Sequence, residues 1–313
     1  MAALAGGGVG CSGDDEAGSP GGSSLSDIQI RDPFILTDRE RGCYYMFGST
    51  DENIWSGPGT GFDCYRSTDL LEWHGPIAAF RPPADFWSTS QFWAPEVHRR
   101  EDAWFMFATF AARGGRGTAV LRADHPEGPY RPWSDGPVTP GDWLSLDGTL
   151  HVDAEAQPWM VFCHEWLQVQ DGEVCAVRLT PDLRAADGEP VVLFRGSDAP
   201  WARPLREPKP GTTTPYVTDG PFLHTTRSGE LLMLWSSFGR SGYAMGVARS
   251  PDGHVLGPWS QDESPLWAEN GGHGMLFRTF DDDLYLTFHS PNETPNERAF
   301  IVPVREQGST LRL

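Results

Sequence analysis

Apolar and polar positions alternate in short runs along the chain, and helical periodicity is nearly absent after the first 25 residues. An apolar run is repeatedly followed by a turn carrying Gly, Asp or Glu, then by a second run and a third that ends in a polar loop, which is typical of antiparallel strands. We expect five sets of three strands, covering residues 30–36, 42–49 and 62–67; 92–98, 103–110 and 118–123; 146–152, 158–164 and 173–179; 216–224, 230–236 and 243–250; and 272–280, 283–289 and 298–304.

The five sets predict an all-β fold, a five-bladed β-propeller with three or four antiparallel strands in each sheet. Two stacked β-sandwiches are the alternative, but they would not produce five equivalent hairpins. No linker divides residues 26–313, so we expect a single propeller domain there. Residues 1–25 are rich in Gly and Ser and are expected to form a flexible tail.

Within this tail, Gly8-Val9-Gly10-Cys11 and the polar residues after it resemble the end of a lipoprotein or secretion signal. A plain disordered tail is the alternative, because the basic and apolar regions of a signal peptide are missing. The pattern slightly favours a secreted or cell-envelope location over a cytoplasmic one. No run approaches the ~18–20 apolar residues of a membrane-spanning helix.

The amino-acid composition further limits the class of protein and its possible partners. The 36 Gly and 27 Pro among 313 residues disfavour a helical bundle, and 13 Trp with 17 Phe exclude a disordered chain. The net charge of −19 disfavours nucleic acid and anionic membranes as partners, because both would be repelled. We expect a monomer that binds a neutral oligo- or polysaccharide, with some Trp side chains stacking on sugar and the others filling the core.

The start of each first strand is where chemistry is expected. In a propeller these strands line the central channel, so their ends meet at one funnel although they lie far apart in the sequence. Asp32, Asp147 and Asp219 begin the first strands of blades one, three and four. Alone, an Asp before Pro or Gly is most often a turn residue. Together, converging carboxylates cost free energy, and two of them suffice to hydrolyse a glycosidic bond.

Four motifs occur in order along the chain: Arg31-Asp32-Pro33-Phe34-Ile35-Leu36, Phe92-Trp93-Ala94-Pro95-Glu96-Val97, Leu146-Asp147-Gly148 and Asp219-Gly220-Pro221. The ordered set resembles glycoside hydrolase family 43 across essentially the whole chain after the tail. The resemblance implies a five-bladed propeller and an inverting enzyme of carbohydrate metabolism and polysaccharide degradation, mostly α-L-arabinofuranosidases, β-xylosidases and arabinanases. It also implies that Asp32 is the general base and that Asp147 raises the pKa of the general acid and orients it.

The identity of the general acid is left open between two residues. The family normally has Glu-Gly-Pro where this chain has Asp219-Gly220-Pro221, and a displacement of about 1 Å can cost ~100-fold in rate. Glu165 is the rival, because the end of the second strand of blade three returns to the funnel beside Asp147. The alternative for Glu165 is a buried structural carboxylate paired with His164 or an arginine.

Three further residues are candidates for binding. Trp93 is expected to contact substrate, as part of a group of six tryptophans near the funnel of which two would stack on sugar: Trp55, Trp87, Trp93, Trp143, Trp166 and Trp201. Arg298 is expected to return to the funnel and pair with a carboxylate. A lone His is more often structural, but the resemblance implies that His273 lies at the channel centre and contacts a structural calcium ion through water, since Ca²⁺ prefers oxygen ligands. No cofactor is expected to be required.

The main hypothesis is therefore an inverting glycosidase that removes α-L-arabinofuranosyl or β-xylosyl units from plant polysaccharide. Another five-bladed glycosidase, such as a β-fructosidase, is disfavoured because its Asn-Asp-Pro-Asn and Glu-Cys motifs are absent. A propeller that binds glycans without cleaving them is the alternative from another class, with the change at Asp219 as a sign of lost catalysis.

Overall fold

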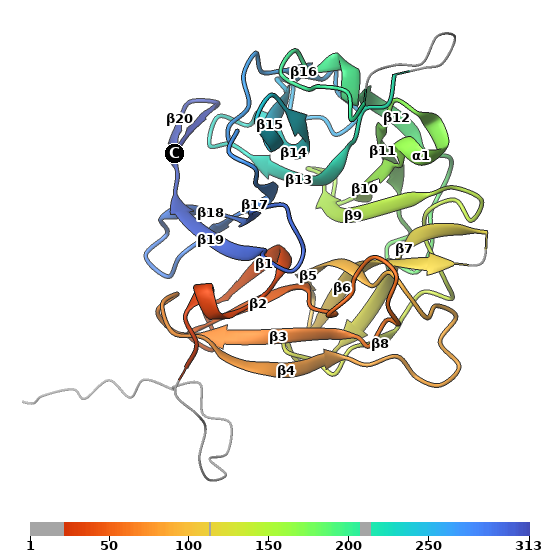
Figure 1. The fold of residues 1–313 in the computed structure, drawn as a ribbon, viewed down its shortest axis with the longest axis vertical. Helices are drawn as coiled ribbons and strands as arrows, with labels where there is room; N and C mark the ends of the chain where they lie inside the picture. The colour runs from red at the N-terminus through yellow and green to blue at the C-terminus, as the bar shows by residue number, and fades with distance from the viewer. Residues whose placement is uncertain (1–21, 113, 207–213) are drawn as a thin grey trace, which may run out of the picture.

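The computed structural model describes residues 22–112, 114–206 and 214–313. Five antiparallel sheets surround a common axis, so the chain is the five-bladed β-propeller that its pattern predicts (Figure 1). All five sheets lie within residues 26–313, whereas residues 1–21 of the predicted tail lie outside the described residues. Within the described ranges, no helix combines the length and apolar character that a bilayer span needs.

The blades follow one another in the sequence, and the second strand pairs with the first and the third. Blade 1 consists of β1 (Arg31–Asp38), β2 (Cys43–Ser49), β3 (Phe62–Ser67) and β4 (His74–Phe80). Blade 2 consists of β5 (Trp93–Arg100), β6 (Ala103–Ala112), β7 (Gly115–Ala123) and β8 (Arg131–Pro132). Blade 3 consists of β9 (Ser145–Val152), β10 (Pro158–His164), β11 (Glu173–Arg178) and β12 (Val191–Arg195).

The remaining two blades lie toward the C-terminus. Blade 4 consists of β13 (Asp219–Thr225), β14 (Leu231–Gly239), β15 (Gly242–Ser250) and β16 (Ser260–Gln261). Blade 5 consists of β17 (Gly272–Arg278), β18 (Leu284–Ser290) and β19 (Arg298–Pro303), and a separate hairpin follows with β20 (Arg305–Gln307) and β21 (Thr310–Arg312). The helical elements are short: η1 (Leu25–Asp27), α1 (Trp166–Val169) and η2 (Gly196–Asp198).

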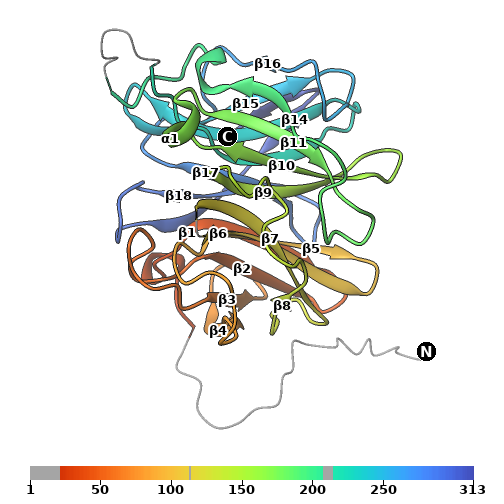
Figure 2. The ribbon, with the colours of Figure 1, turned by 90° about the vertical axis from the view of Figure 1, so that its right-hand side faces the viewer.

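The innermost strands of neighbouring blades contact one another in a closed circle, which runs β1, β5, β9, β13, β17 and back to β1 (Figure 1). In the side view, blades 1 and 2 occupy the lower half of the molecule and blades 3 and 4 the upper half (Figure 2). Gln29, just before β1, pairs with Arg298 of β19, so the start of the described chain is joined to the last blade. This arrangement brings the starts of the five innermost strands to one end of the channel.

Each innermost strand begins with the same irregularity. In β1, Arg31 pairs with Ser49, but the next regular pair is Phe34 with Phe47. The same shift occurs in the other four blades. The residue after the last pair before the shift has a positive φ in every blade, namely Asp32 (54°), Ala94 (44°), Asp147 (56°), Gly220 (52°) and His273 (52°). Because such a bulge interrupts the alternation of side chains, two successive residues can face the channel mouth.

The peptide N–H groups at these positive-φ positions join neighbouring blades. Four of them donate to a side chain on the second strand of the preceding blade: Ala94 to Ser49 (2.9 Å), Asp147 to Thr109 (2.8 Å), His273 to Ser236 (2.8 Å) and Asp32 to His289 Nδ1 (3.2 Å). Cys163 occupies the equivalent position in blade 3. There, the Gly220 N–H donates instead to the Asp147 carboxylate, at 3.0 Å. We call these five hydrogen bonds the blade ring.

Apolar side chains fill the space between blades. A cluster of aromatic rings packs blade 1 against blade 2, with Phe62, Phe80, Phe92 and Phe110 all buried. Similar clusters join blade 2 to blade 3, blade 3 to blade 4 and blade 4 to blade 5. The burial of these rings stabilises the fold and fixes the spacing of the innermost strands.

Candidate active site

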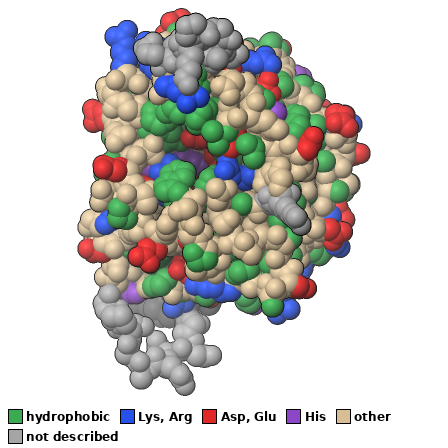
Figure 3. All heavy atoms as spheres, turned by 45° about the vertical axis from the view of Figure 1, so that its right-hand side comes forward, with side chains coloured by type: hydrophobic (Ala, Val, Ile, Leu, Met, Phe, Trp, Pro, Cys, Tyr) green, Lys and Arg blue, Asp and Glu red, His purple; other side chains and the backbone are tan. Residues whose placement is uncertain are grey.

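A pocket of about 370 Å³ opens at the channel mouth where the innermost strands begin. The space-filling view shows a hollow with acidic, arginine and histidine side chains inside it and apolar side chains around its rim (Figure 3). Its lining comes from all five blades: Arg31, Asp32, Ile54, Trp55, Trp93, Leu146, Asp147, Glu165, Trp166, Leu205, Val217, Asp219, Phe238, Tyr243, His273, Asn292 and Thr294.

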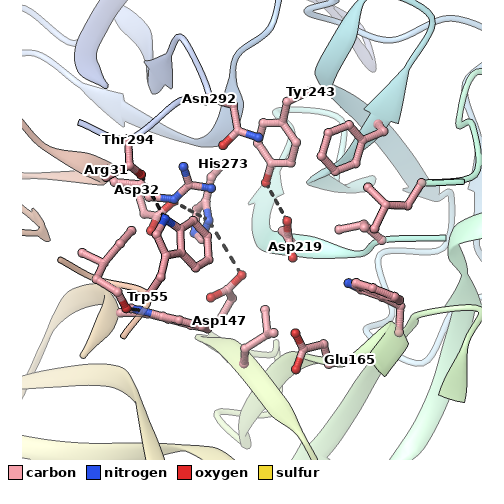
Figure 4. A pocket seen from close by; sticks show the side chains of 17 residues that line it. Arg31, Asp32, Trp55, Asp147, Glu165, Asp219, Tyr243, His273, Asn292 and Thr294 are labelled. Carbon is pink, nitrogen blue, oxygen red and sulfur yellow. Dashed lines mark hydrogen bonds and ion pairs between the residues drawn. The ribbon is translucent and has the colours of Figure 1, made fainter. Parts of the chain in front are cut away.

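Asp32 and Asp147 meet in this pocket, as the propeller geometry predicts. The Nδ1 atom of His273 lies 3.0 Å from Asp32 Oδ1 and 3.7 Å from Asp147 Oδ2 (Figure 4). Burial disfavours the charged imidazole, but Asp32 and Asp147 outweigh it and raise the pKa of His273 to about 10. A buried imidazolium therefore lies between two carboxyl groups that come from different blades.

Asp32 is held in its ionised form. Ser49 Oγ donates to Asp32 Oδ2 at 3.0 Å, and Arg31 Nε lies 3.7 Å from Oδ1. Burial alone would raise the pKa of Asp32, but the charge and hydrogen bond of His273, together with Arg31, hold this pKa well below its usual value. Asp32 is thus an anion that can accept a proton or a hydrogen bond from water.

Asp147 and Asp219 have the opposite tendency. Burial and the nearby charges of Asp219 and Asp32 raise the pKa of Asp147 to about 7, although His273 opposes the shift. Burial and the Asp32 charge likewise raise the pKa of Asp219, against His273 and the hydrogen bond from Tyr243 Oη, which is 3.0 Å long. Two neighbouring carboxyl groups that resist ionisation are suited to hold a proton near neutrality.

The strand register places Asp219 one residue earlier than Asp32 and Asp147. Asp219 pairs with Ser236 as Arg31 pairs with Ser49, and Gly220 has the positive φ that Asp32 and Asp147 have. All three acids lie at the start of an innermost strand, as the sequence predicts, but their positions in the strand are not equivalent. Asp219 still lines the pocket, because both residues of the bulge face the mouth.

Glu165 also lines the pocket, from the end of β10. It stands immediately before α1, and its carboxylate forms an ion pair with the buried guanidinium of Arg116. Burial raises the pKa of Glu165, although Arg116 opposes the shift. Arg116 in turn donates to Gln91 at 2.9 Å and lies 4.3 Å from the centre of the Trp93 ring. His164 does not pair with Glu165; its Nδ1 lies 3.2 Å from Glu173.

Three of the six candidate tryptophans line the pocket: Trp55, Trp93 and Trp166. The other three pack against neighbouring side chains. Trp87 packs on Phe110, Trp143 stacks on His164 and Trp201 packs on Trp235. The role of Trp93 in substrate binding stays a prediction that its position allows.

Arg298 is not part of the pocket, so the prediction that it returns to the funnel is wrong. Its guanidinium donates to the backbone carbonyls of Ser26, Pro295 and Glu297. These bonds tie the start of β19 to η1 on the outside of blade 5. The arginine that lines the pocket is Arg31, next to Asp32 in the first motif.

The residues at the site do not provide a direct metal site. In the part of the chain that the structure describes, no group of three or more His, Cys, Asp or Glu side chains could hold a metal ion. The imidazolium of His273 already supplies positive charge between Asp32 and Asp147. A structural calcium ion that His273 contacts through water stays a prediction, and no step proposed below requires it.

Sequence reasoning did not identify four of the polar residues that line the pocket: Arg31, Tyr243, Asn292 and Thr294. Arg31 precedes Asp32, and strict strand alternation would point it away from the mouth. Asn292 and Thr294 lie in the loop between β18 and β19, whose shape no local pattern reveals. The position of Tyr243 could have been predicted. It lies at the start of β15, which pairs with the end of β14, and the end of β14 returns to the channel mouth.

The fold and the pocket define a class, namely a five-bladed propeller whose clustered carboxyl groups at the channel mouth are suited to acid and base chemistry. Residues 25–307 match the glycosyl hydrolases family 43, and the chain belongs to this family. It is therefore a glycosidase, and its substrate is a carbohydrate.

Solved structures support this assignment. The chain is similar to an endo-arabinase from Bacteroides thetaiotaomicron, with 38% identity and a TM-score of 0.84 over 92% of this chain and 99% of that chain. An endo-1,4-β-xylanase from the same organism shares the fold, with 22% identity and a TM-score of 0.72 over 93% of this chain and 96% of that chain. An α-L-arabinofuranosidase from Lactobacillus brevis does so as well, with 20% identity and a TM-score of 0.69 over 90% and 92% of the two chains.

Proposed function

We propose that the protein is an inverting glycosidase that hydrolyses α-L-arabinofuranosyl linkages of plant polysaccharide or its oligosaccharides. The observation that carries this proposal is the meeting of Asp32 and Asp147 at one nitrogen of His273, in a pocket that two further carboxyl groups line. Inversion requires a base on one face of the sugar and an acid on the other. The pocket offers both.

Asp32 acts as the general base in this proposal. Its carboxylate takes a proton from a water molecule while the oxygen of that water attacks the anomeric carbon, and the glycosidic bond breaks on the opposite face. The bond from Ser49 and the ion pair with His273 fix the orientation of the carboxylate. Positive charge at His273 also reduces the repulsion between Asp32 and Asp147.

The general acid gives its proton to the leaving oxygen, and Glu165 and Asp219 both remain candidates. Burial raises the pKa of each carboxyl group, which favours a protonated form before reaction. Asp219 occupies the family position but is shorter, whereas Glu165 is longer but paired with Arg116. Asp147 accepts a hydrogen bond from the Gly220 N–H next to Asp219, and the charge of Asp219 is one cause of the raised pKa of Asp147. In this proposal Asp147 orients the donor and keeps the donor protonated, as the family resemblance implies.

The arabinofuranosyl preference rests on similarity. The endo-arabinase from Bacteroides thetaiotaomicron is 38% identical over nearly its whole length, whereas the xylanase and the arabinofuranosidase are 22% and 20% identical and support only the fold. Linkages between arabinofuranosyl units are therefore the first substrates to test, and β-xylosides are the second.

The test is an assay of the purified protein on p-nitrophenyl α-L-arabinofuranoside, p-nitrophenyl β-D-xyloside and linear arabinan, with the product anomer followed by proton NMR. We expect hydrolysis of arabinofuranosyl linkages and initial appearance of the β anomer. Initial appearance of the α anomer would contradict inversion. Hydrolysis of the xyloside alone would contradict the proposed sugar, and binding of arabinan without hydrolysis would identify a glycan-binding propeller.

A further inference from the structure

We propose that Arg31 and Asn292 bind the hydroxyl groups of the sugar that is attacked at its anomeric carbon, and so determine which glycosyl unit the pocket accepts. This inference rests on the proposed function. It assigns the Asp32 side of the pocket, which consists of Arg31, Asp32, Trp55, Asn292 and Thr294, to that sugar (Figure 4).

Arg31 is a fixed hydrogen-bond donor with spare capacity. Its Nη1 donates to Glu297 at 3.1 Å, and its guanidinium lies 5.0 Å from the centre of the Trp55 ring. Glu297 is fully buried, so the position of this ion pair is well determined. A guanidinium carries five N–H donors, and in the described structure only the Glu297 bond is made. Arg31 lines the pocket. Among the described residues, the buried polar atoms that lack a hydrogen-bond partner include no nitrogen of Arg31.

Two further contacts extend this support to the rim. Thr294 Oγ1 donates to Glu297 and accepts from Trp55 Nε1, the second bond being 3.1 Å long. The half-exposed Trp55 is thus connected through Thr294 and Glu297 to Arg31. The connected side chains form one wall of the pocket, in which an aromatic ring and a charged donor lie next to each other, and such a combination can bind a sugar ring and its hydroxyls.

Asn292 is oriented by a neutral histidine. His289 is fully buried, and burial together with the Arg31 charge lowers its pKa to about 3. Its Nδ1 accepts from the Asp32 N–H, so the proton lies on Nε2, which is 3.2 Å from Asn292 Oδ1. Nε2 therefore donates to the amide oxygen, and the amide NH₂ group of Asn292 remains for a ligand in the pocket.

The position of both donors relative to Asp32 identifies the sugar that they meet. The attacking water must lie between Asp32 and the anomeric carbon, so the ring that carries this carbon lies over the Asp32 side. Both acid candidates, Glu165 and Asp219, lie across the pocket (Figure 4). The departing sugar or alcohol therefore lies toward Glu165 and Asp219.

The test combines enzyme variants with substrates that lack one hydroxyl. Arg31→Lys keeps the positive charge beside Asp32 but loses the planar fork, and Asn292→Ala removes the amide. The substrates are p-nitrophenyl α-L-arabinofuranoside and its 2-deoxy, 3-deoxy and 5-deoxy analogues. The control is Asn296→Ala, in the same loop but exposed and not lining the pocket.

On the parent substrate, we expect kcat/KM to fall about 10- to 100-fold for Arg31→Lys and about tenfold for Asn292→Ala, with no change for the control. On the analogue that lacks the hydroxyl group bound by the substituted residue, kcat/KM of the variant and of the wild-type enzyme should differ by less than about threefold. The hydrogen bond to that hydroxyl is then absent in both enzymes. The pH at which the acidic limb of the profile falls should stay unchanged in Arg31→Lys.

Equal losses on the parent and on every deoxy analogue would overturn the inference, because they indicate a purely structural role. A shifted acidic limb with no substrate coupling would assign Arg31 to the pKa of Asp32 instead. These outcomes are distinct from failure of the proposed function, in which the wild-type enzyme would hydrolyse neither the parent arabinofuranoside nor linear arabinan.

Discussion

The two sides of the pocket differ in how firmly their carboxyl groups are held. On the Asp32 side, one carboxylate is fixed by Ser49, His273 and Arg31, and its own peptide is fixed by His289. On the opposite side, which we call the Glu165 side, the described residues supply Asp219 with one hydrogen bond, from Tyr243, and Glu165 with one ion pair, to Arg116. A base that must align water against carbon needs a single position, whereas a proton donor can follow different leaving groups.

The electrostatic environments differ in the same way. His273 and Arg31 lower the pKa of Asp32, while burial raises the pKa of Glu165 and Asp219. One pocket thus has a carboxyl group with a lowered pKa on one side and two carboxyl groups with raised pKa values on the other, which is the direction of separation that a base and an acid require. This difference supports Asp32 as the proposed base and leaves Glu165 and Asp219 as candidates for the acid.

The largest expected effect tests the Asp32 side. Asp32→Asn keeps the shape of the side chain but removes its ability to take a proton, so kcat should fall by about 10³-fold on arabinofuranosides with good and poor leaving groups alike. Steady-state kinetics measure this loss, and circular dichroism checks that the variant is folded. A variant that keeps more than a tenth of the wild-type kcat would remove Asp32 from the reaction.

The Glu165 side is tested by changing the leaving group. The variant that removes the true donor, either Glu165→Gln or Asp219→Asn, should lose about 10²-fold in kcat on arabinan oligosaccharides. On 2,4-dinitrophenyl arabinofuranoside, which departs without a proton, the same variant should approach the wild-type rate. The other variant serves as the control. Absence of rescue in both variants would show that the donor is a different group.

Gly220 lies between the two sides of the pocket, next to Asp219 and against the His273 ring. Substitution of Gly220 therefore tests how rigidly His273 is held. A Cβ atom there would lie 2.6 Å from the His273 ring, and its φ of 52° is strained for other residues. We expect Gly220→Ala to lower the free energy of unfolding by about 3 kcal/mol.

Gly308 provides the matched control, with a φ of 61° and no heavy atom within 4 Å of an added Cβ. Gly308→Ala should cost only the strain of the backbone, about 1 kcal/mol. Urea unfolding of both variants measures the difference. Equal losses would mean that His273 moves aside easily, and the rigid placement of the imidazolium would be wrong.

A pH dependence of stability tests the charge of His273, which lies between the two sides. The folded-state pKa of His273 is raised from 6.5 to about 10, so its ion pairs contribute full stability below about pH 6.5 and lose it as the pH rises through about 10. The difference in unfolding free energy between the wild type and His273→Gln should therefore shrink over this range, as urea titrations at several pH values measure. A difference that grows with pH would contradict a charged His273.

The sequence predicts the parts of the molecule that depend on repetition. The apolar runs identify the first three strands of every blade, and radial symmetry brings Asp32 and Asp147 together although they lie far apart in the chain. The short outer strands β8 and β16 contain two residues each and follow loops, so no periodicity marks them.

Local backbone shape explains what the sequence does not predict. The bulge at the start of each innermost strand turns two successive residues toward the mouth, which displaces Asp219 by one position and makes Arg31 a lining residue. Strand alternation cannot anticipate this. Arg298 is predicted wrongly because it contacts nearby loop carbonyls, and the path of the loop before it depends on tertiary contacts.

One of the five hydrogen bonds of the blade ring differs from the others, because its acceptor is the carboxylate of Asp147. This restricts which substitutions position 147 can accept. Hydroxyl or imidazole groups of non-acidic side chains make four of its bonds, but Cys163 in blade 3 leaves the fifth to the carboxylate of Asp147. One side chain therefore serves both the proposed chemistry and the contact between blades 3 and 4. A lineage that lost its need for hydrolysis could not discard this acid freely, since the same change would loosen the closed circle of sheets.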